Sequence, residues 1–315
     1  QNETLGCTYP NSSNYDSLAT VDDGSCLYRM TYVPDDNFEQ RLIDLGYDTV
    51  LTLNDSVPSI NIRFVTSLNV YNDSIADLTG IENFEYLTTL YCSHNQLDTL
   101  DVSNNTALTF LYCPYNQLTS LDVSGATALT DLDCYFNQLT TLDVSTNTAL
   151  TDLSCGDNLL TSLDVSGATA LTTLSCYNNQ LSTLDVSQDT ALTFLSCFNN
   201  QLDSLDVSQN TALTILYCHT NQLTTLDVSN GNNTNFTYFG AANNPNLYCI
   251  DVDDLAWADT NWTVANGNIN YWNSFSNDCQ NEIPGCADSL ANNYDPTATL
   301  NACDYGYTYT PDDNF

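Results

Sequence analysis

The chain has 315 residues, with 39 Asp or Glu and only three cations, so its formal net charge is −36. All three cations are arginines (Arg29, Arg41 and Arg63). So few cations exclude nucleic-acid binding, which needs Lys and Arg to replace phosphate counterions, and disfavour an anionic membrane surface. Hydrophobic residues make up 42% of the chain, which argues against disorder. No apolar run approaches the ~18 residues of a membrane helix, and no signal peptide is visible, so we expect a mature or truncated chain.

Residues 1–30 form the first predicted element, a small disulfide module. Cys7 and Cys26 lie outside the repeats described below and are expected to pair, as in proteins of oxidising compartments. Their loop contains a DDG turn and three clustered carboxylates, from Asp16, Asp22 and Asp23. Clustered carboxylates at a glycine turn suit calcium, which prefers oxygen ligands. The alternative is an Asp-rich turn without an ion.

Residues 31–67 are predicted to form an N-terminal cap. Pro34 to Gly46 reads as a short amphipathic helix, with Asp36 and Glu39 at capping-box spacing and Gly46 as the stop. Solenoids need caps over their open ends. The residues expected to cover the first coil are Phe38, Leu42 and Leu45.

Residues 68–247 are governed by a 21-residue period, which predicts a solenoid. The first clear repeat spans residues 87–107 and has Leu87, Leu90, Cys92, Asn95 and Leu97 in its first half. Apolar and polar residues alternate in each half, as expected for a strand with one buried face. We therefore expect about nine coils stacked at ~4.8 Å. Further full repeats begin at Leu108, Leu129, Leu150, Leu171, Leu192 and Leu213, and degenerate ones flank them.

The motif LxxLxCxxNxL is the leucine-rich repeat signature, and about 180 residues resemble that family. The following LxxLDVS half resembles a bacterial 21-residue subclass in which each coil carries two short strands. The resemblance therefore implies a β-rich solenoid built from leucine-rich repeats.

Two columns of the repeat are predicted to be structural. The repeat cysteines invite a metal or redox interpretation, but no CxxC pair is present, and we expect small buried side chains in a narrow core. The repeat asparagines are expected to form a buried ladder that satisfies backbone groups where the chain leaves each strand. The cysteines are Cys92, Cys113, Cys134, Cys155, Cys176, Cys197 and Cys218, and the asparagines are Asn95, Asn116, Asn137, Asn158, Asn179, Asn200 and Asn221.

The two outward faces of the repeats differ. The LDVS face is uniform, with an Asp column from Asp101 to Asp227, and is predicted to be a solvated ladder or, alternatively, a strip for cations or lateral packing. The LxxLxC face varies and carries aromatic residues, which reduce solubility unless they contact something. It is the predicted binding face for a glycan or a protein, unless its aromatics merely cover one another. Its members are Phe110, Tyr112, Tyr135, Tyr177, Phe194, Phe198, Ile215 and Tyr217.

The C-terminal part is predicted to contain three elements. Residues 248–280 form a cap in which a Cys249–Cys279 disulfide encloses Trp257, Trp262 and Trp272. Residues 281–307 form a second small disulfide module, with Cys286 paired to Cys303, and residues 308–315 start the next cap. Residues 6–38 and 285–315 are two copies of one segment, so we expect one unit of a longer tandem array.

The small modules and the PDDNF cap start resemble segments of large secreted surface proteins of Bacteroidota. This resemblance implies type IX secretion and an extracellular, cell-surface location. The leading hypothesis is a structural and adhesive repeat unit of a long surface filament that assembles with other chains. The alternative is a secreted binding module for a glycan or protein ligand, like internalin-type repeat proteins.

Catalysis is not expected. The two histidines, His94 and His219, lie many repeats apart, and no nucleophile–base arrangement accompanies either of them. Calcium is the only cofactor considered, and neither nucleic acid nor membrane insertion is expected.

Overall fold

The computed structural model describes residues 3–10, 12, 14–49, 51–283, 288–292 and 294–299. The chain divides into two compact units, residues 1–159 and 160–315. None of the helices in the described part of the chain has the length and hydrophobicity needed to cross a membrane.

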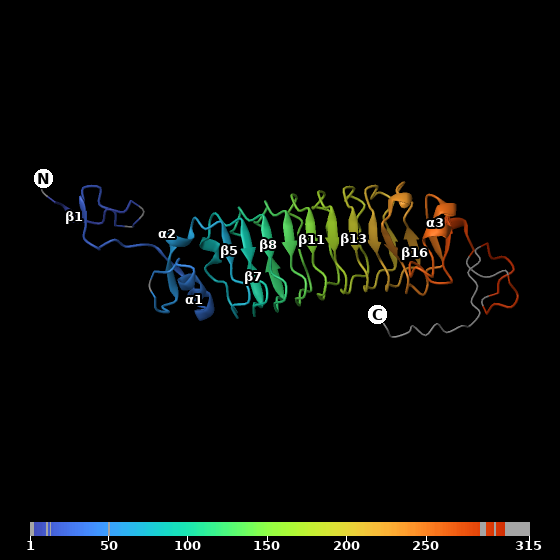
Figure 1. Cartoon of the computed structure of the whole chain (residues 1–315), viewed down its shortest axis with the longest axis horizontal. Coiled ribbons are helices and arrows are strands. Elements are labelled where there is room, and N and C mark those ends of the chain that lie inside the picture. The colour runs from blue at the N-terminus through green and yellow to red at the C-terminus, as the bar shows by residue number, and fades with distance from the viewer. Residues whose placement is uncertain are drawn as a thin grey trace. The chain divides into compact units, whose positions relative to one another are not determined.

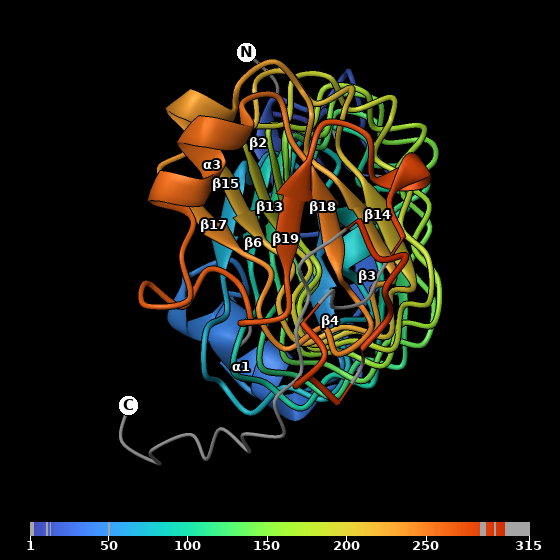
Figure 2. The ribbon, with the colours of Figure 1, turned by 90° about the vertical axis from the view of Figure 1, so that its right-hand side faces the viewer.

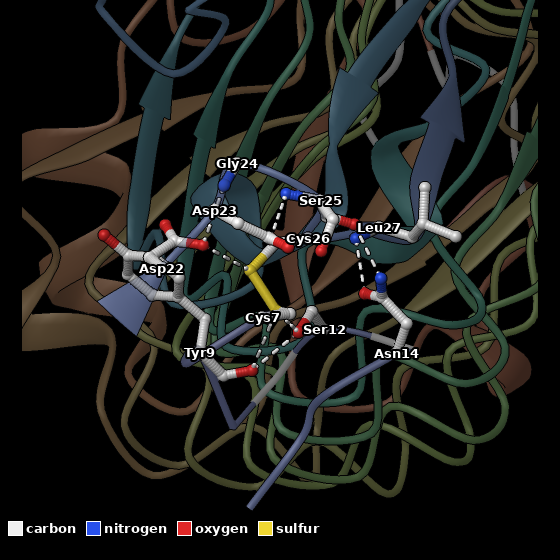
Figure 3. Close-up of a disulfide and its surroundings, with 10 residues drawn as sticks. All are labelled: Cys7, Tyr9, Ser12, Asn14, Asp22, Asp23, Gly24, Ser25, Cys26 and Leu27. Carbon is white, nitrogen blue, oxygen red and sulfur yellow. Dashed lines mark hydrogen bonds between the residues drawn. A yellow bond between two sulfur atoms is a disulfide. The ribbon is translucent and has the colours of Figure 1, made fainter. Parts of the chain in front are cut away.

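The first unit begins with the small module. Its two short strands, β1 (Leu5–Gly6) and β2 (Val21–Asp22), pair in parallel. The predicted Cys7–Cys26 disulfide is formed (Figure 3). The Cys286–Cys303 pair and the second PDDNF segment were also predicted, but they lie outside the described residues.

The N-terminal cap combines a hairpin-like pair with two helices. Strands β3 (Met30–Tyr32) and β4 (Ser56–Pro58) are antiparallel, and α2 (Ser59–Ile62) follows directly. Helix α1 (Asp36–Asp44) buries Phe38, whose ring packs on Phe84 with centroids 6.4 Å apart. It also buries Leu42, so two of the three predicted contacts over the first coil are present; Leu45 is 38% exposed.

The predicted capping box of α1 was wrong by one residue. Asp35, not Asp36, is the N-cap, and its carboxylate accepts from the N–H groups of Asn37 and Phe38. Glu39 does not turn back to the cap. Its buried carboxylate accepts from the N–H groups of residues 54–56, so it fixes the loop that leads into β4. Gly46 (φ 76°) ends the helix as predicted.

The coils of the first unit stack their strands in one parallel row (Figure 1). Neighbouring strands pair with a shift of one repeat, so that Leu90, Leu111 and Leu132 lie opposite one another and are buried. A 3₁₀ turn (Ile81–Asn83) precedes the second coil. The strands of this row are β5 (Ser67–Asn69), β6 (Thr89–Tyr91), β8 (Phe110–Tyr112), β10 (Asp131–Asp133) and β11 (Asp152–Ser154).

The second unit has the same design and ends in the C-terminal cap. One row contains β12 (Thr173–Ser175), β13 (Phe194–Ser196), β15 (Ile215–Tyr217) and β17 (Tyr238–Gly240). The other contains β14 (Ser204–Asp206), β16 (Thr225–Asp227), β18 (Cys249–Asp251) and β19 (Ser274–Ser276). The two rows form two sides of the coils (Figure 2). Two 3₁₀ turns lie at Asn233–Asn235 and Cys279–Asn281.

The C-terminal cap plugs the core with an aromatic cluster. Helix α3 (Leu255–Asn261) leads to Trp262, which is 4% exposed and stacks on Phe239 with centroids 4.1 Å apart. The Cys249–Cys279 disulfide is formed as predicted. Because β18 and β19 pair within residues 248–280, the β-solenoid continues into the segment that was predicted to be only a cap.

The prediction of two strands in every coil was only partly right. The LDVS half forms strands in the first unit at β7 (Thr99–Asp101) and β9 (Ser120–Asp122), and in the second at β14 and β16. Residues 141–143, 162–164 and 183–185 form no strand. In the second unit, Leu163 and Leu184 of these looser coils are 7% and 8% exposed, whereas Leu226 is 1% exposed.

The repeat cysteines are buried thiols, as the packing interpretation predicts. Burial raises the pKa of Cys155 to about 12 and the pKa values of Cys92 and Cys218 further. A metal ligand or nucleophile has to be the thiolate. These thiols therefore serve as small apolar side chains in a narrow core.

Candidate binding surface on the strand faces

The asparagine ladder positions the strand faces. In the first unit, the Nδ2 of Asn137 donates to the carbonyls of Cys113 and Cys134, at 3.2 and 3.0 Å, and its Oδ1 accepts from the N–H of Leu118 at 3.0 Å. In the second unit, Asn200 bonds in the same way to Cys176, Cys197 and Leu181. Each amide ties a coil to the coil before it, so the strands and their outward side chains are held in fixed register.

The residue before each ladder asparagine has a positive φ. In the first unit these residues are His94, Tyr115, Phe136 and Asp157, with φ between 50° and 56°. Asn and Asp tolerate this left-handed region, whereas bulky residues rarely adopt it. The second unit has Asn178, Asn199 and the β-branched Thr220 at the same position. Aromatic residues in strained backbone positions are a reason to look for function at this turn.

The first-unit strand face carries a contiguous set of rings. Tyr91 on β6 lies 5.3 Å from Phe110 and 6.2 Å from Tyr112, both on β8. The turn residues form a second column, in which Tyr115 stacks between His94 at 4.4 Å and Phe136 at 4.7 Å. Tyr91, Tyr115 and Phe136 are 36%, 41% and 43% exposed, so the set forms an aromatic surface rather than a buried cluster.

A tyrosine pair connects the two columns. The hydroxyls of Tyr112 and Tyr135 lie 2.9 Å apart and share a hydrogen bond. Burial and the bond to Tyr112 raise the pKa of Tyr135. Tyr135 also meets Tyr115 edge-on, with centroids 5.6 Å apart. Tyr135 therefore stays neutral at physiological pH, with its hydroxyl held against that of Tyr112.

Three carboxylates lie beside these rings. Asp131 and Asp133 on β10 pair in register with Phe110 and Tyr112 of β8 on one side, and Asp131 pairs with Asp152 of β11 on the other. Burial, together with Asp131 and Asp152, raises the pKa of Asp133. These three residues will be called the strand-face carboxylates.

The second-unit strand face is aromatic without such carboxylates. Tyr177, Phe198 and His219 form a stack with centroid distances of 4.9 and 4.6 Å. Tyr217 on β15 stacks on Tyr238 of β17 at 4.2 Å. Burial lowers the pKa of His219. The other outward positions of its strands are neutral (Thr173, Ser175, Phe194, Ser196 and Ile215).

The eight predicted binding residues divide into two groups. Phe110, Tyr112, Phe194, Ile215 and Tyr217 lie on strands. Tyr135, Tyr177 and Phe198 lie in the turns that follow the strands. Sequence reasoning missed Tyr91, the turn residues Tyr115 and Phe136, and the strand-face carboxylates. Comparing the second x of each CxxN segment would have revealed the turn column.

The LDVS face of the second unit forms an open groove of ≈ 860 Å³. Its carboxylates are engaged in local turns, since the Oδ1 of Asp185 accepts from the N–H of Ser187 at 2.9 Å. This bond lowers the pKa of Asp185. The same bond forms at Asp122 in the first unit, which is the solvated ladder expected from the sequence. The acidic residues that line the groove are Asp164, Asp185, Asp206, Asp227 and Asp251.

The candidate calcium residues are likewise engaged in turns. Asp16 accepts from the N–H two residues further on at 2.8 Å. Asp22 and Asp23 do the same at 3.1 and 2.9 Å (Figure 3). Among the described residues, the carboxylates that come within 4.8 Å of one another are instead Asp36, Glu39 and Asp55. Both oxygens of Glu39 already accept from backbone N–H groups. Calcium at the small module stays a prediction.

Comparison with known proteins gives partial matches. No protein-family model matches the chain. Over 74 residues, or 24% of the chain, the sequence is 44% identical to internalin J of Listeria monocytogenes, and the match spans 8% of that protein's length. In a solved structure described as the functional domain of InlJ from Listeria monocytogenes, which includes a cysteine ladder, identity is 30% and the TM-score 0.42, covering 71% of this chain and 68% of that one.

Two further solved structures are similar to the chain. A leucine-rich repeat protein of Leptospira interrogans has 17% identity and a TM-score of 0.48, with 65% of each chain covered. Internalin C2 of Listeria monocytogenes has 18% identity and a TM-score of 0.48, covering 78% of this chain and 95% of that one. With its 21-residue coils, paired strands and asparagine ladder, the chain is a leucine-rich repeat β-solenoid.

Proposed function

We propose that the chain is a non-enzymatic, extracellular binding module whose strand faces capture a macromolecular ligand. The observation that carries this proposal is the contiguous aromatic surface of the first unit, where Tyr91, Tyr115 and Phe136 are all at least 36% exposed. Exposed apolar patches of this kind usually mark interaction sites. Ladder asparagines hold the patch rigid, which reduces the entropy lost on binding.

Two further observations support binding. The aromatic turn residues Tyr115 and Phe136 occupy a strained backbone region that carries Asn178, Asn199 and Thr220 in the second unit, and such strain persists chiefly at functional sites. The partial similarity to internalin J supports a protein displayed on a bacterial surface. Type IX secretion and attachment to the cell surface are the finer form of this proposal, and they rest on the small-module resemblance.

Binding is tested with the whole chain on a panel of extracellular proteins and immobilised glycans. The test variant is Tyr91→Ser/Phe110→Ser, which removes two rings of the first-unit face. The matched control is Thr99→Ala/Ser120→Ala on the LDVS face of the same unit. Loss of binding in the test variant alone is expected. A wild-type chain that binds nothing on the panel, or equal binding by all three proteins, contradicts the proposal.

A second function, assembly into a surface filament, is favoured by one local feature. In this strongly acidic chain, Arg29 and Arg63 line the same small pocket with Tyr28. Beside it, Phe64 and Tyr86 stack at 5.3 Å and are 58% and 48% exposed. Arg63 is paired with Glu85 of the same pocket at 2.8 Å. Arg29, beside these rings on a chain of net charge −36, is therefore the charge that suits an acidic surface of a second copy.

Filament assembly is tested by electron microscopy and by sedimentation of the whole protein. The Arg29→Gln/Arg63→Gln variant is expected to shift assembled wild-type protein towards single chains, more strongly at low salt. The control is Arg41→Gln, which removes the third arginine away from the patch. Discrete wild-type monomers at every concentration contradict assembly.

Calcium binding by Asp16, Asp22 and Asp23 would stiffen the small module in either function. The measurement is the melting temperature in calcium and in EGTA. A lower melting temperature in EGTA, abolished in Asp22→Asn/Asp23→Asn, is the expected result. An unchanged melting temperature removes calcium from the proposal.

A further inference from the structure

The first-unit strand face combines carboxylates with adjacent aromatic rings. We infer that it binds a Lys- or Arg-bearing segment of a different protein, whose cationic groups pair with Asp131, Asp133 and Asp152 while their stems pack on the adjacent rings. This inference rests on the proposed binding function and specifies the ligand class.

The strand-face carboxylates form one acidic surface. Asp131 and Asp152 lie side by side in the strand register, and Asp131 and Asp133 project from the same side of β10. Their hydrogen-bond donors are neutral: Thr130 donates to Asp131 at 2.6 Å, and Thr151 donates to Asp152 at 2.9 Å. The hydroxyl bonds order the carboxylates but leave their negative charge uncompensated.

The electrostatics of Asp133 show that this arrangement is unfavourable without a partner. Burial is the largest reason why the pKa of its carboxyl is raised, Asp131 and Asp152 raise it further, and a hydrogen bond from the neutral Ser154 side chain offsets only part of this increase. On the LDVS face of the same unit, by contrast, the backbone N–H of Ser124 lowers the pKa of Asp122. A cation placed beside Asp133 would lower the pKa of its carboxyl, because an opposite charge favours the ionised form.

The chain does not supply that cation. Within the described residues, the arginine ion pairs are Arg41 with Asp73, at 3.3 Å, and Arg63 with Glu85, at 2.8 Å, and neither involves a strand-face carboxylate. There is no lysine, and Arg29 is the one remaining cation of the sequence. A second copy has a net charge of −36 and offers Arg29 as its one arginine outside these ion pairs, which is too little positive charge for three carboxylates. The complementary partner is therefore another, cationic protein.

The aromatic geometry favours a cationic protein over a neutral glycan. A sugar ring binds by stacking on an open aromatic face, but both faces of Tyr115 are covered, by His94 and Phe136, with interplanar angles of 15° and 13°. The hydroxyls of Tyr112 and Tyr135 are bonded to each other. The surface left open to a ligand consists of aromatic ring edges next to the strand-face carboxylates. Lys and Arg match this surface, because their aliphatic stems cover apolar groups while their heads stay polar.

The test measures binding of defined probes to the immobilised whole chain. The probes are an extended peptide with alternating Lys and Leu, the same peptide with Gln in place of Lys, and a neutral oligosaccharide of N-acetylglucosamine. The test variant is Asp131→Asn/Asp133→Asn/Asp152→Asn. The matched control, Asp101→Asn/Asp122→Asn/Asp143→Asn, removes the same charge from the LDVS face of the same unit and keeps the turn-forming oxygens.

The expected result is that the Lys peptide binds the wild type and the control within about twofold of each other, and binds the test variant at least about tenfold more weakly. The Gln peptide and the oligosaccharide should bind poorly to all three proteins. Equal weakening in test and control variants would mean attraction by net charge alone, and overturns the inference. So does tight binding of the oligosaccharide that survives in the test variant.

The same experiment separates this inference from the proposed function. If the oligosaccharide or the Gln peptide binds and Tyr91→Ser/Phe110→Ser abolishes that binding, the face is a binding site for a different ligand class. If ligand binding never depends on those rings, the proposed function fails as well.

Discussion

The strand faces of the two units share one scaffold but differ in chemistry. Both are held by the same ladder contacts, exemplified by Asn137 in the first unit and Asn200 in the second. The first adds three carboxylates and places Tyr115 and Phe136 among its positive-φ turn residues, whereas the second has neutral strand residues and Asn178, Asn199 and Thr220 at that turn. Outward positions can thus change coil by coil without disturbing the register, so ligand chemistry is local to a few coils.

The largest expected effect tests whether the scaffold is equivalent in the two units. Asn137→Ala removes an amide that satisfies two carbonyls and one N–H in the core. Unpaired buried polar groups cost about 1–3 kcal/mol each, and we expect a loss of about 3 kcal/mol in the free energy of unfolding. Asn200→Ala should cost the same, as measured by denaturant unfolding.

Gln138→Ala is the matched control for this pair, because Gln138 is exposed and adjacent to the ladder. It should change stability by less than about 0.5 kcal/mol. If the two ladder variants differ by more than about 1 kcal/mol, the scaffold is not equivalent in the two units.

The next effect concerns a buried carboxyl within the coils of the second unit. Asp189 is 1% exposed and both its oxygens lack a hydrogen-bond partner among the described residues. Asn147 of the first unit occupies the same repeat position and donates to the carbonyls of Val123 and Ala126, at 3.1 and 2.9 Å. Burial, and then Asp185, raise the pKa of Asp189 to about 6.

A raised carboxyl pKa makes the ionised form unfavourable in the folded state. Stability should therefore be full below the unfolded pKa of about 4 and fall as the pH rises to about 6. Asp189→Asn should remove that dependence and stabilise the chain by about 2 kcal/mol at pH 7. Urea unfolding at pH 4 and pH 7 measures this, with the exposed Asp203→Asn as control. A variant no more stable than the wild type at pH 7 would contradict the prediction.

A smaller effect sharpens the comparison of the two turns. Phe136→Ala removes one ring from the stack with Tyr115 and should cost about 1 kcal/mol. Phe136→Asn, which copies the second unit, should cost roughly half as much, because Asn tolerates the left-handed backbone. Thermal unfolding of both variants gives the order. If Asn is the worse substitution, the turn is not strained.

The smallest effect separates binding from stability at the strand-face carboxylates. Removing their charge should stabilise the chain by a few tenths of a kcal/mol at pH 7, since partly exposed charges are screened. Because the pKa of Asp133 is raised, the gain should vanish below about pH 4. A clear loss of stability would mean that these residues are retained for folding rather than for a ligand.

The repeat made most of the fold predictable. Leucine spacing, the ladder and the thiol column follow from one period, and Phe110 and Tyr112 follow from alternation along a strand. Alternation ends where the strand ends, so Tyr115 and Phe136 were missed. Their outward placement depends on a positive φ at the second x of CxxN, which only a comparison of that position across the repeats would have revealed. The helix cap was misplaced by one residue, because Asp35 and Asp36 are equally good caps locally and only the bonds of Asp35 to Ala76 and Asp77 decide between them.

The strand-face carboxylates could not be predicted from the sequence, because Asp is so common in this chain. With 34 Asp residues in the sequence, Asp131 and Asp133 carry little information individually. They stand out only in the structure, where the rings of β8 lie on one side and Asp152 on the other. The sequence adds that the chain has no lysine to pair with them.

The buried thiol column also has a consequence for how the chain matures. Seven thiols share the sequence with cysteines that must form disulfides, so every unfolded chain under oxidising conditions can form many wrong pairs. Coil formation is the protecting step, because a buried thiol with a raised pKa reacts slowly. The yield of correctly paired chains therefore depends on whether the coils stack before the repeat thiols are oxidised. Contacts between neighbouring coils join residues only 21 positions apart, and such local contacts form quickly. Stacking should therefore be faster than oxidation.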